Sequence, residues 1–186
     1  NNSAYLFTME KFSFTARLLH WSIALLLLIQ IPLAWYMIDL PLSADKLAKY
    51  ALHKSFGMLL FTLAVIRLVR AILGKRPQLP PDTKPYEKTI AKTTQGLLYA
   101  IIILMPITGW LMSSAANVPV TLFSMLTLPN LVEPNKALME ILQIVHETLS
   151  LVLLTLVSLH VLAGLKHHFI GRNNVLYSML PLIKKR

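Results

Sequence analysis

Cysteine is absent from this chain of 186 residues. Its absence excludes disulfide bonds, thiolate zinc sites, iron–sulfur clusters and the covalent attachment of c-type haem. Charged residues are scarce at 14%, whereas apolar residues make up 55% of the sequence. This balance is typical of membrane proteins rather than of soluble domains.

Acidic residues are the rarer of the charged ones, at 8 against 18 Lys and Arg, which gives a formal charge of +10. A strongly basic chain can bind nucleic acid or a membrane surface. Here the basic residues flank apolar segments and do not form a soluble basic face. We therefore expect membrane lipid as the partner, and no nucleic acid.

Four apolar segments are long enough to cross a membrane, for which about 20 residues are needed. We expect them at about residues 15–38, 50–73, 89–114 and 136–170. The predicted fold is all-α, a transmembrane four-helix bundle forming a single membrane domain over residues 1–186. We expect no cleavable signal peptide, because the first apolar segment is long enough to span. Residues 1–8 precede Met9 and are expected to be a tail or a non-native remnant.

Two connections between the apolar segments differ in composition. Residues 75–85 contain four prolines and are expected to be an extended link between the second and third spans. Residues 117–135 are moderately apolar but too short and too interrupted by proline to span. For that stretch we expect an interfacial loop or a short helix over one mouth of the bundle.

The distribution of Lys and Arg predicts how the bundle is oriented. Fourteen of these residues flank the chain termini and the link between the second and third spans, and four lie on the opposite side. Cytoplasmic loops of membrane proteins carry the excess of positive charge. We therefore expect both termini in the cytoplasm. The four residues on the other side are Lys46, Lys49, Lys54 and Lys136.

Four of the six histidines lie within or at the ends of apolar segments. His146 and His160 are 14 residues apart in one segment, so on a helix they share a face and are separated by about 21 Å. With the predicted topology, His20 and His160 lie at one depth near the cytoplasm, and His53 and His146 at another near the outside. A single membrane histidine is often just a satisfied polar group. Four at two matching depths favour two bis-histidine haem b sites, which suit electron transfer because the iron keeps no open position.

Two glycines follow histidines at a helical spacing. Gly57 is four residues after His53, and Gly164 is four residues after His160. Each is expected beside its histidine on the same helix face, where the missing side chain makes room for a flat macrocycle. Close packing between helices is the ordinary alternative for a membrane glycine.

Arginines are placed where haem propionates would need partners. Arg67 is 14 residues after His53, which puts it on the same face at the depth of His20 and His160. An arginine there can hold carboxylates through bidentate hydrogen bonds. Arg17 and Arg70 are further candidates. Snorkelling to the interface is the alternative interpretation.

His167 lies two helical turns beyond His160. We consider two roles for it with equal weight. It can line a pocket beside the inner haem and hand protons to a quinone. It can also belong to a basic interfacial cluster with Lys166 and His168.

These motifs together resemble the bacterial cytochrome b561 family of dihaem inner-membrane proteins, which includes superoxide oxidase. The resemblance covers nearly everything after Met9 and includes all four histidines in order. The matching pieces are Leu19-His20-Trp21, Leu52-His53-Lys54-Ser55-Phe56-Gly57, Val65-Ile66-Arg67, Pro106-Ile107-Thr108-Gly109, His146-Glu147, Leu159-His160, Lys166-His167-His168 and Met179-Leu180-Pro181.

The resemblance implies two haem b groups and an oxidoreductase in the bacterial inner membrane that exchanges electrons with ubiquinone. Superoxide would be oxidised at the periplasmic face. Some members carry extra histidines at the start of the third span, where this chain has residues 92–95, Lys-Thr-Thr-Gln. That departure argues against carrying a quinone or proton role over to the third span.

Two other hypotheses remain open from the sequence. In one, the chain is a haem-bearing relay subunit or anchor that docks a periplasmic redox partner on residues 117–135. In the other, it is a membrane protein without redox function whose histidines bind zinc or copper.

Overall fold

The computed structural model describes residues 11–74, 83–171 and 175–180. In that part of the chain, the order of elements is α1 (Phe14–Asp39), α2 (Ala44–Leu73), α3 (Pro85–Ala115), β1 (Val120–Leu122), β2 (Leu126–Leu128), α4 (Lys136–Phe169) and α5 (Val175–Met179). The helices α1 to α4 are each long and apolar enough to cross a membrane. The chain is therefore an α-helical, multi-pass membrane protein. The expected N-terminal tail and residues 75–82 of the proline-rich link lie outside the described residues.

Two helices begin earlier than their apolar runs predict. The helix α2 begins at Ala44 because the hydroxyl of Ser43 accepts a hydrogen bond from the Lys46 amide, which caps the first turn. The helix α3 begins at Pro85, whose fixed φ suits a first helical turn. At 1.5 Å per residue, both helices exceed a hydrocarbon core of about 30 Å. Both helices are therefore longer than a membrane span requires.

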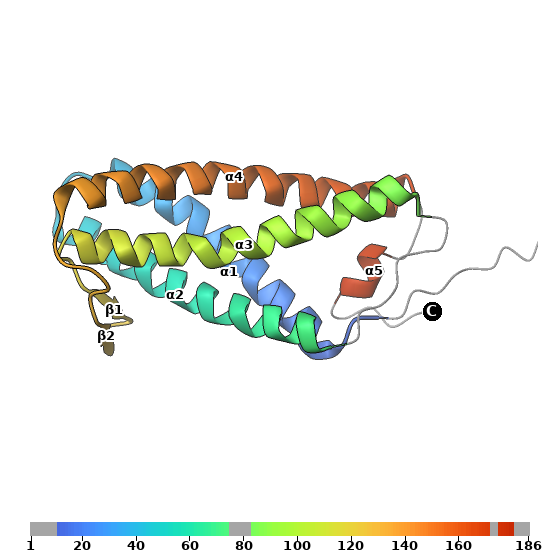
Figure 1. The fold of residues 1–186 in the computed structure, drawn as a ribbon, viewed down its shortest axis with the longest axis horizontal. Helices are drawn as coiled ribbons and strands as arrows, with labels where there is room; N and C mark the ends of the chain where they lie inside the picture. Colours follow the sequence, from blue (N-terminus) through green and yellow to red (C-terminus); the bar gives the residue numbers. More distant parts are fainter. Residues whose placement is uncertain (1–10, 75–82, 172–174, 181–186) are drawn as a thin grey trace, which may run out of the picture.

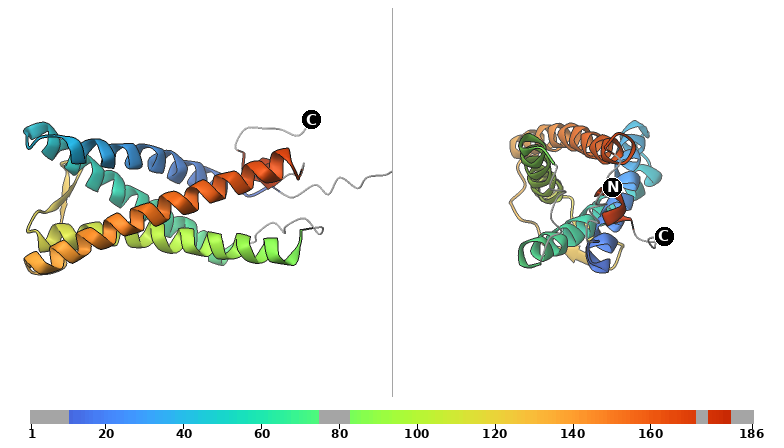
Figure 2. Two further views of the ribbon diagram at one scale, coloured as in Figure 1. Left: turned by 90° about the horizontal axis from the view of Figure 1, so that it is seen from above. Right: turned by 90° about the vertical axis from the view of Figure 1, so that its right-hand side faces the viewer.

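Neighbours in sequence are neighbours in the bundle. The helix α1 packs on α2, α2 on α3, and α3 on α4, and the end-on view in Figure 2 shows the four helices around a common axis. The helix α4 runs obliquely, close to α3 at one end and to α1 at the other (Figure 2). We call the end that carries β1 and β2 the hairpin end. The opposite end, where α1 starts and α5 lies (Figure 1), we call the basic end.

Residues 120–128 form a β-hairpin, so of the two alternatives expected for this stretch, a loop or a short helix, the helix is wrong. The register pairs Val120 with Leu128 and Leu122 with Leu126. The turn places Phe123 and Ser124 at φ values of 46° and 61°, a left-handed conformation that residues with a Cβ rarely adopt.

Contacts with α2 hold this turn. The amide of Phe123 donates to the hydroxyl of Ser55, and the Phe123 ring packs edge-on against Phe56 with centroids 5.7 Å apart. Ser55 itself is 2% exposed. Tertiary contacts therefore compensate for a turn that the local sequence does not favour.

The buried apolar core forms a layer halfway along the bundle. Its members come from all four spanning helices: Ile23, Leu26, Leu27, Leu60, Ala64, Ile101 and Leu153. Leu153 is seven residues from both His146 and His160, so it lies midway between them on α4. The tightest packing thus separates the two levels at which the sequence predicts cofactors.

Candidate haem sites

At the hairpin end, His53 of α2 faces His146 of α4 across the bundle. Their ring centroids are 6.4 Å apart with an interplanar angle of 74°. Both side chains are half-buried. We call them the hairpin-end pair.

At the basic end, His20 of α1 faces His160 of α4. Their ring centroids are 6.1 Å apart and the rings are inclined at 68°. His20 is half-buried and also packs edge-on against Trp21, at 5.5 Å between centroids, whereas His160 is exposed. We call these two residues the basic-end pair.

Both separations suit two imidazoles that share one metal ion. A metal–imidazole bond is about 2.0 Å long, and a ring nitrogen lies about 1.1 Å from the ring centre. Two rings on opposite sides of one ion therefore have centroids about 6.2 Å apart, close to the 6.1 and 6.4 Å observed.

Each pair supplies two ligands and no more. Among the described residues, no group of three or more His, Cys, Asp or Glu side chains could hold a metal ion. A zinc site built from protein usually has three or four ligands. A porphyrin supplies the four equatorial nitrogens itself, so paired histidines fit haem better than zinc.

Thr108 of α3 orients the His146 ring, a role that sequence reasoning did not assign. Its Oγ1 donates to the Met105 carbonyl oxygen at 2.8 Å and lies 2.9 Å from His146 Nδ1. A hydroxyl has one hydrogen, so toward His146 it must accept. Nδ1 then carries the proton and Nε2 keeps the lone pair that a metal requires.

Gly109 lets α3 approach the same ring. A Cβ at Gly109 would lie 3.2 Å from Cε1 of His146. The Thr-Gly dipeptide thus positions and accommodates one histidine. The sequence carried one sign that α3 is special here, because Pro106 and Gly109, two residues that weaken a helix, lie inside an otherwise apolar span.

The space beside Gly57 is taken by a side chain. A Cβ at Gly57 would lie 3.3 Å from Nε2 of Gln30, which reaches from α1 to donate to the His53 carbonyl oxygen at 2.7 Å. Gly57 therefore admits Gln30. By contrast, nothing described lies within 4 Å of a Cβ at Gly164, so the space there is open.

The three candidate arginines gather at the basic end. Arg67 donates to the Ala16 carbonyl oxygen at 2.7 Å and lies within electrostatic reach of His20 and His160. Arg17 donates to the carbonyl oxygen of Leu180, just past α5, and Arg70 donates to the Ser13 hydroxyl that caps α1, both at 2.8 Å. The charge of Arg67 thus acts on the basic-end pair. Arg17 and Arg70 fasten the start of α1 to the neighbouring segments.

His167 lies beside an ion pair that joins α3 to α4. Lys166 Nζ is 3.0 Å from Oε1 of Glu87, and His167 is half-buried within electrostatic reach of that carboxylate. His168 instead packs against Tyr177 of α5, at 5.2 Å between ring centroids. The two adjacent histidines therefore serve different contacts.

Comparison with known proteins agrees with this arrangement. The family model described as prokaryotic cytochrome b561 matches residues 11–182. The chain is 27% identical to cytochrome b561 homolog 2 of Escherichia coli K12, over 93% of both chains. It is also 27% identical to the probable superoxide oxidase CybB of Yersinia pestis, over 95% of this chain and 98% of that one. The chain therefore belongs to the prokaryotic cytochrome b561 family of haem b-binding membrane electron-transfer proteins.

Proposed function

We propose that this protein is a superoxide oxidase, which transfers electrons across the bacterial inner membrane from periplasmic superoxide to ubiquinone. It would hold two haem b groups, one on the hairpin-end pair and one on the basic-end pair. The observation that carries the proposal is the spacing of the two histidine pairs, 6.4 and 6.1 Å between ring centroids. The resemblance to a probable superoxide oxidase supports the choice of donor.

The excess of basic residues at the basic end supports an orientation in which that end faces the cytoplasm. Both termini would then lie inside, and the hairpin end would face the periplasm. In this orientation, the hairpin-end pair is the one that a periplasmic donor would reach.

Bound at such a pair, haem supplies one-electron redox chemistry without an open iron position. The protein's part is to hold and orient the ligands. Thr108 fixes the tautomer of His146, and Gln30 ties α1 to the backbone of His53. The apolar layer around Leu153 lies between the two levels. In the net reaction, two superoxide ions become two O₂, while one quinone takes up two electrons and two protons.

Lys54 is the lysine at the hairpin end best placed to attract an anion. Lys46 is engaged with the carbonyl oxygens of Ile38 and Leu40, and Lys49 is paired with Asp45 at 3.0 Å. Lys54 is half-buried next to His53, and no partner for its ammonium group is found in the described part of the chain. Its charge is therefore available to draw superoxide locally.

A second function, electron relay for a docked periplasmic protein, is favoured by the surface of the hairpin. Met125 is 89% exposed, Leu126 58% and Phe123 48%. Exposed apolar side chains grouped on one element mark a contact surface. That surface would then serve a protein donor, and the chain would have no small-molecule substrate of its own.

Stopped-flow mixing with superoxide tests the proposal. Haem in the oxidised protein should be reduced rapidly, and H53A or H146A should lose one of two haems and the fast phase. H20A or H160A should lose the other haem and keep the fast phase. K54Q should keep both haems and slow the reaction, with less dependence on salt. If the protein holds two haems that superoxide does not reduce, the superoxide oxidase function is refuted and the relay function stands. If the protein binds no haem, both functions are refuted.

A further inference from the structure

The β-hairpin presents apolar side chains away from the bundle. The strand β1 packs on α2, and β2 is its outer neighbour. Phe123, Met125 and Leu126, in the turn and at the start of β2, are all exposed, and Met125 is the most exposed of them. We call these three side chains the hairpin face. A surface of this kind contacts either lipid or another protein, and the charge and the depth of the hairpin distinguish the two.

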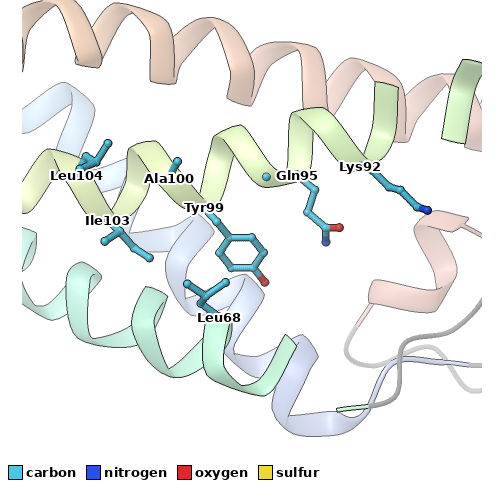
Figure 3. A pocket seen from close by; sticks show the side chains of 8 residues that line it. Leu68, Lys92, Gln95, Tyr99, Ala100, Ile103 and Leu104 are labelled. Carbon is cyan, nitrogen blue, oxygen red and sulfur yellow. The ribbon is translucent and has the colours of Figure 1, made fainter. Parts of the chain in front are cut away.

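The whole connection around the hairpin lacks charge. Residues 117–132 contain no Asp, Glu, Lys, Arg or His, whereas residues 39–49, where α1 meets α2 at the same end, contain four charged residues. Figure 3 shows that the opposite end of α3 differs too, since Lys92 and Gln95 extend from it. Docking sites for soluble proteins have a polar rim whose charges orient the partner. An apolar face without charge therefore suits lipid better than a protein.

Aromatic side chains mark the level at which the membrane surface crosses this end of the bundle. Trp35 and Tyr36 of α1, Tyr50 of α2 and Trp110 of α3 each lie within six residues of the hairpin-end terminus of their helix. Trp and Tyr are enriched at the membrane–water interface, where their rings lie among the lipid head groups. Trp35 and Tyr36 are exposed, as rings that meet lipid are. Three helices thus indicate one level for the interface.

Hydrogen bonds hold the hairpin at that level. Trp110 donates from Nε1 to the carbonyl oxygen of Pro129, the residue after β2, at 3.0 Å. The hydroxyl of Ser55, a little over one turn past Tyr50 on α2, accepts from the Phe123 amide at 3.0 Å. The hairpin therefore lies in the interfacial layer and not above it in water. Hydrocarbon does not tolerate the open edges of a two-stranded sheet, so the hairpin does not lie deeper either.

We propose that the hairpin face inserts into the interfacial lipid of the leaflet at the hairpin end and anchors the bundle at a fixed depth. Ser55, which holds the turn, is two residues after His53. Trp110, which holds the end of β2, is two residues after Thr108, the contact of His146. The anchor is thus attached to the helix segments that position the hairpin-end pair, and it keeps that pair close to the membrane surface. This assignment removes the docking surface that the relay function would use.

The lack of native cysteine lets single thiols report the surroundings of chosen side chains. M125C reports on the hairpin face. K136C is the reference in water, because the Lys136 side chain is 85% exposed at the first residue of α4. Met125 is 89% exposed, so without a membrane the two thiols would be equally accessible. L28C is the reference in lipid, because Leu28 is exposed near the middle of α1.

The test uses the haem-loaded protein in nanodiscs of phosphatidylethanolamine and phosphatidylglycerol. One chain to a disc exposes both membrane faces to water and excludes cover by a second copy. A sulfonated maleimide, which stays in water, labels the thiols, and mass spectrometry follows the rate. M125C should react about tenfold or more slowly than K136C, as L28C should, because lipid excludes the reagent and disfavours the reactive thiolate.

A phospholipid that carries a photoreactive diazirine near its head group provides the second measurement. It should crosslink to residues 123–126 of the wild type. Crosslinking should fall about fivefold in M125S/L126S, which removes most of the apolar surface that inserts. Both side chains are exposed, so the haem content of this variant should equal that of the wild type.

Two results would overturn the inference. If M125C is labelled as fast as K136C, the hairpin face lies in water, where a protein donor can use it. If M125C is labelled slowly but no lipid crosslinks to the hairpin, protein covers the face instead. Neither measurement involves an electron donor, so the inference and the proposed function fail separately.

Discussion

Replacing Thr108 with valine tests whether a hydroxyl fixes the tautomer of a haem ligand. The substitution keeps the shape of the side chain and removes the oxygen 2.9 Å from His146 Nδ1. A buried N–H left without a partner costs about 1–3 kcal/mol, which corresponds to about 5- to 150-fold in affinity. The Met105 carbonyl also interacts with His146 and can take over part of the bond. We therefore expect a loss at the lower end of that range, so that haem binds about 5- to 10-fold more weakly at the hairpin-end pair.

Transfer of haem to excess apomyoglobin provides the assay, followed in the Soret band. In T108V, one of two haems should leave about 5 to 10 times faster, and the other at the wild-type rate. T108S keeps the hydroxyl and should behave like the wild type. T155V is the matched control, because Thr155 bonds only within its own helix, to the Leu151 carbonyl, on an exposed face. Equal haem loss from T108V and the wild type would refute the tautomer argument.

Two further substitutions test contacts that only the folded chain reveals. In G57A, the Cβ crowds Gln30 and this cost offsets the gain of about 1 kcal/mol that alanine has over glycine within a helix, so the stability should hardly change; in a Q30A background the crowding is gone and G57A should stabilise the protein by about 1 kcal/mol. A double-mutant cycle by thermal unfolding measures the coupling, and additive effects would show that Gly57 has another role. S55A should cost about 1 kcal/mol, because it removes the part-buried hydrogen bond from the Phe123 amide to the Ser55 hydroxyl. The hairpin should then become protease-sensitive, and unchanged cleavage would contradict its anchoring by Ser55.

The sequence predicted the spanning helices well because their signal is local. A run of about 20 apolar residues has few alternatives in a membrane, where every backbone polar group must bond within its own segment. The first turns of α2 and α3 were missed. The cap at Ser43 and the start at Pro85 extend each helix toward its N-terminus, past the beginning of its apolar run. The hairpin was missed because its turn uses Phe123 and Ser124 instead of glycine.

The candidate sites were predictable in part. Helical periodicity placed His146 and His160 on one face of α4, and matching depths grouped them with His53 and His20. Thr108 escaped notice because its partner lies 38 residues away on another helix. Gly57 was expected to make room for a macrocycle or to allow close packing between helices, and the sequence did not reveal that Gln30 from α1 lies beside it.

The sequence by itself determined the four spans, the two depths of histidine and the family, since all three depend on order and spacing along one chain. Only the tertiary structure decided which groups surround each ring, because the angle at which helices cross and the rotation of each about its axis come from packing between segments distant in sequence. That packing brings α4 to α2 at one level and to α1 at the other.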